Sequence, residues 1–394
     1  MTTARTASPR TARAINDRLA LELLVERGPL TANQLKQATG LSRPTVADLV
    51  ERLRDGGLIR VVGEAGEQRR GPNARLYGLA ADRAHIAAAD VRTRSVSLAV
   101  ADLAGGVLAE TVLPVDPSRP AARIVEDAVS ALGRTLRESG ADATLHTIVV
   151  GAPGLVDPAT GELSATGALP AWHAEFVAAL RTGLDAPVLL DNEVNLAGIA
   201  EAQVGAAADR ETFVLMWLGH GVGAAVILEG RLRRGASGGT GEIGFLPVPG
   251  TSGLPSATVC DGGFHSLAGS AAVCALARRH GIAAASEDDP PAAEAALGEA
   301  LGTGNGAFLD ELAGRIAIGA AALTAVLDPG CVVLGGEVGR AGGAELTRRV
   351  QTRLEELSPL HTQVRAGTVE GSPVLRGAMV IALDAARRDL FATV

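Results

Sequence analysis

Two segments of this chain repeat one order of strands and turns. Residues 85–115 have the pattern of three strands separated by short turns, and residues 213–235 repeat the same order. A helical pattern over 121–138 and a strand-like run over 146–154 follow the first segment. Antiparallel strands followed by alternating helices and strands predict an α/β fold. The repetition predicts an internally duplicated domain whose two lobes enclose a cleft.

The length of 394 residues is typical of two or three domains. We divide the chain into a flexible basic arm, a small N-terminal module and the duplicated domain: residues 1–13, 14–80 and 84–394, the last with lobes at about 84–205 plus the C-terminal helix and at 206–380. No apolar run approaches the ~20 residues that span a bilayer, and no signal-peptide core follows the basic N-terminus. We therefore expect a cytoplasmic protein without membrane contact. Its three cysteines share no metal-ligand spacing, so we expect no metal or other cofactor.

The N-terminal module carries the start and stop signals of three helices. Apolar side chains follow helical spacing over residues 14–27, namely Ile15, Leu19, Leu23 and Leu24. Thr31 and Gln34 form a capping box that starts a short second helix. Ser42 is the expected N-cap of a third helix, with Pro44 in its first turn. Two strand-like pieces follow and indicate a β-wing, so the module is predicted to be a winged helix-turn-helix.

In this arrangement the third helix lies in the major groove of DNA, and its first turns meet the base edges. The loop of the expected wing is narrow and cationic, which suits insertion beside the backbone or into the minor groove. The predicted contacts to double-stranded DNA are Gln34, Lys36, Ser42, Arg43, Thr45, Asp48, Arg69 and Arg70. Residues 1–80 carry 13 basic and 8 acidic side chains, so they are +5 while the remainder is −13. Such an asymmetry favours DNA binding at one end, although a three-helix protein-interaction module is the alternative.

A glycine-rich turn over 219–223 lies between two strands, where bare backbone can approach phosphate closely or can simply form a tight hairpin. The order of motifs around it resembles the ROK family of repressors and sugar kinases, across essentially the whole chain. The matching pieces are Gly151-Ala152-Pro153-Gly154, Leu169-Pro170-Ala171-Trp172, Asp191-Asn192-Glu193-Val194-Asn195, the glycines at 219–223, Glu242-Ile243-Gly244-Phe245, Leu327-Asp328-Pro329 and Val333-Leu334-Gly335-Gly336. The resemblance implies an actin-like, hexokinase-like fold with a winged helix of the regulator branch.

The chain departs from the family's kinases where the chemistry takes place. In those kinases an Asn-Asp pair binds the sugar and the Asp takes the hydroxyl proton, whereas here Asn192 is followed by Glu193. The extra methylene moves the carboxylate by roughly 1.5 Å, and misplacement by about 1 Å can cost on the order of a hundredfold in rate. A glycine of the first phosphate loop is replaced by Arg92, two residues after Asp90. Its side chain would occupy space meant for phosphate and Mg²⁺.

The family's sugar- and zinc-binding His is replaced by Phe245, and its zinc cysteines align with Ser256, Thr258 and Gly263, with His265 at the position of a glutamate. Zinc needs thiolate or imidazole ligands, so this site is expected to be empty. The residues that remain able to bind an effector are Gly154, Asn192, Glu193, Glu242, Phe245 and His265. The vestigial nucleotide loops contain Asp90, Gly219, Gly221, Gly223, Gly335 and Gly336.

We therefore expect a regulator, acting as a repressor of carbohydrate-related genes, without kinase activity. It would bind a palindromic operator as a homodimer or homotetramer, and a sugar or sugar phosphate in the cleft would control it. Helix-rich segments at 268–280 and 311–326 are candidate dimer surfaces, and acidic residues 286–294 are expected to form a surface loop. Two alternatives remain open, an active sugar kinase with a DNA-binding arm and a DNA-binding regulator that needs no effector.

Overall fold

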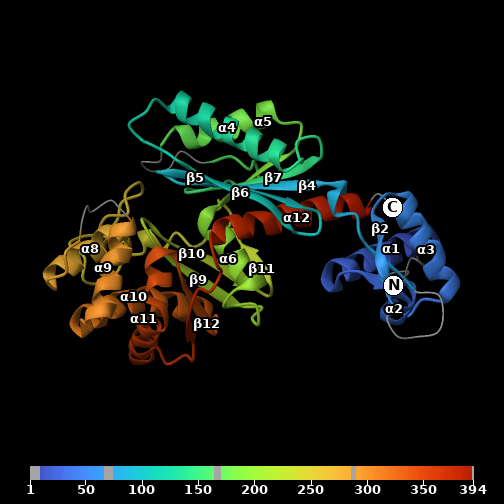
Figure 1. The fold of residues 1–394 in the computed structure, drawn as a ribbon. Coiled ribbons are helices and arrows are strands. Elements are labelled where there is room, and N and C mark those ends of the chain that lie inside the picture. The colour runs from blue at the N-terminus through green and yellow to red at the C-terminus, as the bar shows by residue number, and fades with distance from the viewer. Residues whose placement is uncertain (1–8, 66–73, 164–169, 285–289, 393–394) are drawn as a thin grey trace.

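The computed structural model describes residues 9–65, 74–163, 170–284 and 290–392 of the chain. Three parts are evident: an N-terminal winged helix and two α/β lobes (Figure 1). A long C-terminal helix runs from the lobes to the winged helix and carries the end of the chain there (Figure 1). The predicted α/β class and the two-lobed sugar-kinase-like architecture are confirmed.

The winged helix has the predicted order of helices and strands. Its elements are α1 (Pro9–Arg27), β1 (Leu30–Thr31), α2 (Ala32–Thr39), α3 (Arg43–Asp55), β2 (Ile59–Ala65) and β3 (Ala74–Leu79). Thr31 and Gln34 form the predicted capping box, and Ser42 caps α3. The C-cap of α2 is Gly40, whose φ of 70° is left-handed and favours glycine. The short strand β1, which pairs with β3, was not predicted from the sequence.

Two expectations for the first helix were wrong. Residues 9–13 belong to α1 and not to a flexible arm, while residues 1–8 lie outside the described part of the chain. Ile15 and Leu19 are 57% and 38% exposed, whereas Leu23 and Leu24 are buried. The buried face of α1 is therefore not the one that contains Ile15 and Leu19. It contains Leu21, which is fully buried, and Leu24.

The first lobe is a five-stranded sheet covered by helices. Its elements are η1 (Ala81–Arg83), β4 (His85–Val91), β5 (Ser95–Asp102), β6 (Val107–Pro114), α4 (Ala121–Glu138), β7 (Leu145–Ala152), α5 (Trp172–Gly183), β8 (Val188–Asn192) and α6 (Glu193–Val204). The strand order is β6-β5-β4-β7-β8. The first three strands form the predicted antiparallel meander, and β7 and β8 add in parallel.

The second lobe repeats this sheet. Its elements are β9 (Phe213–Leu218), β10 (Val222–Leu228), β11 (Arg231–Arg233), η2 (Ile243–Phe245), α7 (His265–Ala268), α8 (Ser270–Arg279), α9 (Pro290–Thr303), α10 (Gly306–Leu327), β12 (Cys331–Gly335), α11 (Gly336–Leu357) and β13 (Gln363–Ala366). The order β11-β10-β9-β12-β13 has the same strand directions as the first sheet. This match is the internal duplication that the sequence predicts.

One surface assignment in this lobe needs correction. Residues 290–294 begin α9 and are not a loop, since Pro290 and Pro291 occupy a helix start, where proline is tolerated; residues 285–289 lie outside the described part. The dimer surfaces proposed at 268–280 and 311–326 stay a prediction, and both segments also contribute side chains to the core of the lobe. Phe308, Leu312 and Ile316 of α10 are fully buried there, so most of its apolar stripe is used inside one chain.

Helix α12 (Pro373–Ala392) joins the lobes to the winged helix. It packs on β4, β7 and α6 in the first lobe and on α1 at its other end. Phe391, only 5% exposed, lies in the same apolar core as Leu21 and Leu24 of α1. The winged helix is therefore docked on the last turn of α12.

We predict that Phe391→Ala lowers the free energy of unfolding by about 3 kcal/mol, because it removes a buried ring from this shared core. Arg388→Ala is the matched control, since Arg388 is an exposed residue one turn earlier on α12. Denaturant unfolding of the full chain measures both. Equal, small effects of the two substitutions would contradict the shared core.

Candidate nucleic-acid interface and interlobe cleft

The first turn of α3 presents one free cation. Arg43 is exposed, and its side chain makes no hydrogen bond or ion pair with another described residue. Ser42 and Thr45 are bonded to each other, with 2.8 Å between their hydroxyl oxygens, and the Thr45 N–H donates to Ser42 Oγ over 3.4 Å. The cap thus uses Ser42 and Thr45 to fix the turn, and it leaves Arg43 available at the exposed end of the helix.

Asp48 belongs to an ion-pair network that ties α3 to α1. Its carboxylate accepts a hydrogen bond from Arg52, which also donates to Asp17 over 2.6 and 3.2 Å. Asp17 is 1% exposed, so this is a buried carboxylate with a cationic partner. The hydrogen bonding of Arg52 to the Asp17 carboxylate is the main reason why the pKa of Arg52 is raised. Asp48 therefore helps to position α3 in addition to any contact with a base.

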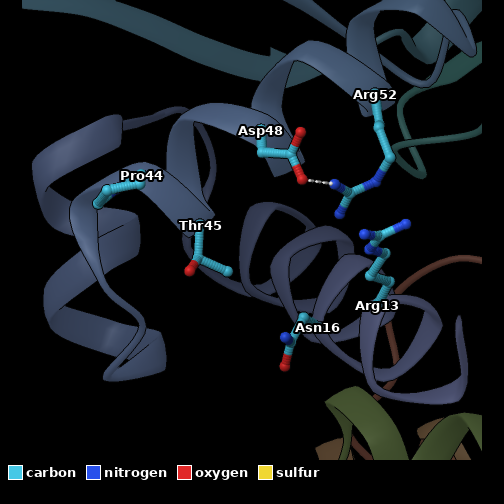
Figure 2. A pocket seen from close by; sticks show the side chains of 6 residues that line it. All are labelled: Arg13, Asn16, Pro44, Thr45, Asp48 and Arg52. Carbon is cyan, nitrogen blue, oxygen red and sulfur yellow. Dashed lines mark hydrogen bonds and ion pairs between the residues drawn. The ribbon is translucent and has the colours of Figure 1, made fainter. Parts of the chain in front are cut away.

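A groove of about 370 Å³ lies between α1 and the first half of α3. Figure 2 shows its lining residues, with Arg13 and Asn16 of α1 opposite Thr45, Asp48 and Arg52. Neither Arg13 nor Asn16 was predicted from the sequence to belong to this surface: Arg13 was assigned to the arm, and Asn16 lies on the first helix, for which no DNA contact was predicted. Pro9, a residue type that often starts helices, was the available signal that the helix begins earlier.

The remaining predicted DNA contacts lie outside α3. Gln34 accepts the Thr31 N–H over 2.8 Å, so its carbonyl oxygen serves the capping box of α2. Lys36 is exposed on the same helix. Arg69 and Arg70 lie outside the described residues.

In the first lobe, Asn192 ends β8 and caps α6. Its Oδ1 accepts the Val194 N–H over 2.8 Å, while its Nδ2 donates to the Gly154 carbonyl over 3.0 Å. Nδ2 also lies 3.3 Å from a carboxylate oxygen of Glu193. The structure thus brings Gly154, Asn192 and Glu193 together, as the sequence predicts.

Glu193 is the titratable group at the centre of this site. Burial raises its pKa to about 7, Arg92 opposes that shift, and the charges of Asp90 and Glu242 add to it. The charge of Glu242 thus acts on Glu193 in the same direction as that of Asp90, and burial also raises the pKa of Glu242 itself. A carboxyl group with this pKa can donate or accept a hydrogen bond near neutral pH.

Phe245 and His265 form a separate part of the second lobe. Gly244 lies beside Phe245 in η2, and a Cβ at Gly244 would lie 3.6 Å from the Cβ of His265. Burial lowers the pKa of His265, and His220 acts in the same direction, so both favour the neutral imidazole. Phe245 is partly buried. Glu242 immediately precedes η2, and its charge also acts on Glu193.

Residues of the loops that were predicted to be vestigial nucleotide loops lie near Arg92. Its Nε donates to Asp90 over 2.7 Å, and its Nη1 lies 3.6 Å from Glu337, the second residue of α11. The guanidinium carbon lies 5.2 Å from the centre of the Trp217 ring. Asp90 is 4% exposed at the end of β4. A cation of the first lobe is therefore held by two carboxylates, one from each lobe.

The glycines of these loops allow close backbone contact. Gly336 has a φ of 75°, and a Cβ there would overlap the Leu218 carbonyl, so only glycine fits. A Cβ on Gly219 would overlap Glu337, whereas one on Gly335 would lie 2.7 Å from Leu215. The other two predicted glycines are less constrained: Gly223 has Val194 as its nearest neighbour, and Gly221 has open space.

Within the described residues, no group of three His, Cys, Asp or Glu side chains is arranged to hold a metal ion. At the position of the family's zinc cluster, Ser256 Oγ accepts the Val259 N–H over 3.0 Å and so closes a turn. None of the described helices is both long and apolar enough to cross a bilayer.

The fold and the two sites define a two-lobed, sugar-kinase-like protein that carries a winged helix-turn-helix. The sequence model of the ROK family matches residues 87–385, and that of the MarR family matches residues 15–71. The chain belongs to the ROK family. This membership confirms the resemblance drawn from the motifs.

This chain is similar both to proteins named as transcriptional regulators and to proteins named as sugar kinases. The DNA-binding transcriptional dual regulator NagC of Escherichia coli (strain K12) is 26% identical over 243 residues, which cover 59% of this chain and 57% of NagC. A glucokinase of Halalkalibacterium halodurans is 26% identical over 278 residues, which cover 64% of this chain and 80% of that enzyme. The structure of a ROK family transcriptional regulator, described as a homolog of the E. coli MLC protein, superposes with a TM-score of 0.72 at 19% identity. It covers 97% of this chain and 100% of that one, so the likeness in fold includes the winged helix.

We predict a pH dependence of stability that Glu193 controls. Its pKa is about 7 in the folded chain against an ordinary value of 4.5, so between these pH values the folded state keeps a proton that the unfolded chain releases. The contribution of Glu193 to the free energy of unfolding therefore falls as pH rises through this window. Glu193→Gln should remove that fall, as measured by urea unfolding from pH 4 to 8.

Glu175→Gln, which changes an exposed carboxylate on α5, is the control and should follow the wild-type curve. If the wild-type and Glu193→Gln curves run parallel across this window, the prediction is wrong.

Proposed function

We propose that this chain is a DNA-binding transcriptional regulator, a repressor of carbohydrate-related genes. The observation that carries the proposal is the core shared by α1 and α12, which couples a winged helix with an exposed Arg43 to the ROK domain. The match of residues 15–71 to the MarR family and the similarity to NagC support it. Arg43 would read base edges, while Lys36 and the wing arginines Arg69 and Arg70 would contact the backbone or minor groove.

We further propose that the ROK domain does not phosphorylate sugars. Arg92 lies among the loops that would hold phosphate and Mg²⁺, where it is bonded to Asp90, faces Glu337 and stacks on Trp217. Glu193 stands in place of the catalytic Asp, and Phe245 in place of the sugar-binding His. A guanidinium that is already paired with two carboxylates would occupy the space of a phosphate without offering it a free charge, so this departure is the strongest of the three.

The cleft would instead bind an effector, a sugar or sugar phosphate, through Gly154, Asn192, Glu193, Glu242, Phe245 and His265. An effector acts only if it prefers one arrangement of the lobes, because equal affinity for both shifts nothing. The operator would be a palindrome read by a homodimer or homotetramer in the cytoplasm, with half-sites spaced by one or more helical turns.

A second candidate is an active sugar kinase. The pKa of Glu193, about 7, is the observation that favours it, because a general base works best with a pKa near the working pH.

Selection of genomic DNA fragments on the purified chain, with and without a panel of sugars and sugar phosphates, distinguishes the candidates. Enrichment of a palindrome that one compound modulates supports the regulator. ADP formation with a sugar and no DNA enrichment supports the kinase, and enrichment that no compound changes indicates a regulator without effector.

We predict that Arg43→Ala relaxes base preference at one position of each half-site, by about 1–3 kcal/mol of discrimination. Arg54→Ala, an exposed arginine in the last turn of α3, is the control and should keep the preference. Competition binding with single-base operator variants measures both. An equal loss of affinity for every sequence after Arg43→Ala would show that Arg43 contacts only phosphate.

A further inference from the structure

Arg92 joins elements that lie far apart in the sequence. Its ion pair with Asp90 lies within the first lobe, whereas Glu337 and Trp217, on its other side, belong to the second lobe. Burial opposes the charge of Arg92, but the two carboxylates outweigh it and raise its pKa. Arg92 is thus a permanent cation between the lobes. We call Asp90, Arg92 and Glu337 the arginine latch.

The latch is also bonded to the start of α12. The second carboxylate oxygen of Asp90 accepts a hydrogen bond from Ser372 Oγ over 3.2 Å. The same Oγ accepts the Leu375 N–H over 3.2 Å, so Ser372 caps the first turn of α12. The negative charge of Asp90 is favourable at this end of a helix. The position of Asp90 therefore fixes the first turn of α12.

Helix α12 connects this point with the DNA-binding module. Its 20 residues span about 30 Å, and its far end reaches the winged helix (Figure 1). There Phe391 belongs to the same apolar core as Leu21 and Leu24. A packed helix moves as a unit, so a shift of its first turn displaces its last. The latch is therefore one end of a continuous physical path from the cleft to the winged helix.

We propose that the arginine latch is an internal substitute for bound nucleotide, which sets lobe closure and transmits it through Ser372 and α12 to the winged helix. This inference rests on the proposed function, because it describes how the same cleft regulates DNA binding. An effector beside Glu193 would compete for the guanidinium of Arg92 and so weaken its contact with Glu337. The lobes would then separate, and the first turn of α12 would move with Asp90.

Hydrogen exchange of the full chain tests the path. Arg92→Gln removes the cation, and Arg94→Gln is the matched control, because Arg94 is an exposed arginine in the same turn. We expect Arg92→Gln to accelerate exchange about tenfold in the first turns of both α11 and α12, and to change operator affinity. Arg94→Gln should do neither. Faster exchange in α11 with α12 unchanged would overturn the path.

Ser372→Ala separates the two ends of the path. It should accelerate exchange in the first turn of α12 while leaving α11 as in the wild type, since the pair between Arg92 and Glu337 remains. If the latch acts through Ser372, the double variant should exchange in α12 no faster than the more affected single variant. Additive effects would mean that Arg92 reaches α12 by another route and would overturn the role of Ser372.

These exchange readouts need no DNA, so absence of operator binding by the wild type would count against the proposed function alone.

Discussion

The carboxylate of Asp90 is the point on which the arrangement of the chain depends. One oxygen is bonded to Arg92 and the other to Ser372, so a single buried side chain at the end of β4 holds the interlobe cation and the start of α12. Its burial makes these bonds necessary, because an unpaired carboxylate inside the protein would be costly. The second lobe is attached to this point by Glu337 and Trp217, and the winged helix by the core around Phe391.

The duplicated fold preserves the architecture that the chain shares with sugar kinases of the ROK family. Both lobes keep the same sheet, and the close-packed glycines Gly219 and Gly336 keep the loops that resemble a nucleotide site. In the function we propose, Arg92 would fill that site with a charge from within the chain. The polar groups around Asn192 and Glu193 would then remain to bind a ligand.

The sequence predicted features that depend on neighbouring residues and missed those that depend on distant ones. The capping box at Thr31, the cap at Ser42, both strand meanders and the α4 boundaries follow from local rules and are confirmed. The bond between Arg52 and Asp17 and the contact of Arg92 with Glu337 join residues that no local pattern links. Residues 9–13 were assigned to an arm because their composition is polar and basic, yet they extend a helix that tertiary packing stabilises. The buried helices of the second lobe could not be distinguished from surface helices by periodicity alone.

The central claim is that Arg92 replaces bound nucleotide, and calorimetric titration of Mg·ATP into the wild-type chain tests it most directly. The account predicts no saturable heat, because the guanidinium already occupies the phosphate region and its carboxylate partners would repel an anion. Saturable binding at one nucleotide per chain would contradict the account and would return the ROK domain to the class of functional nucleotide-binding proteins.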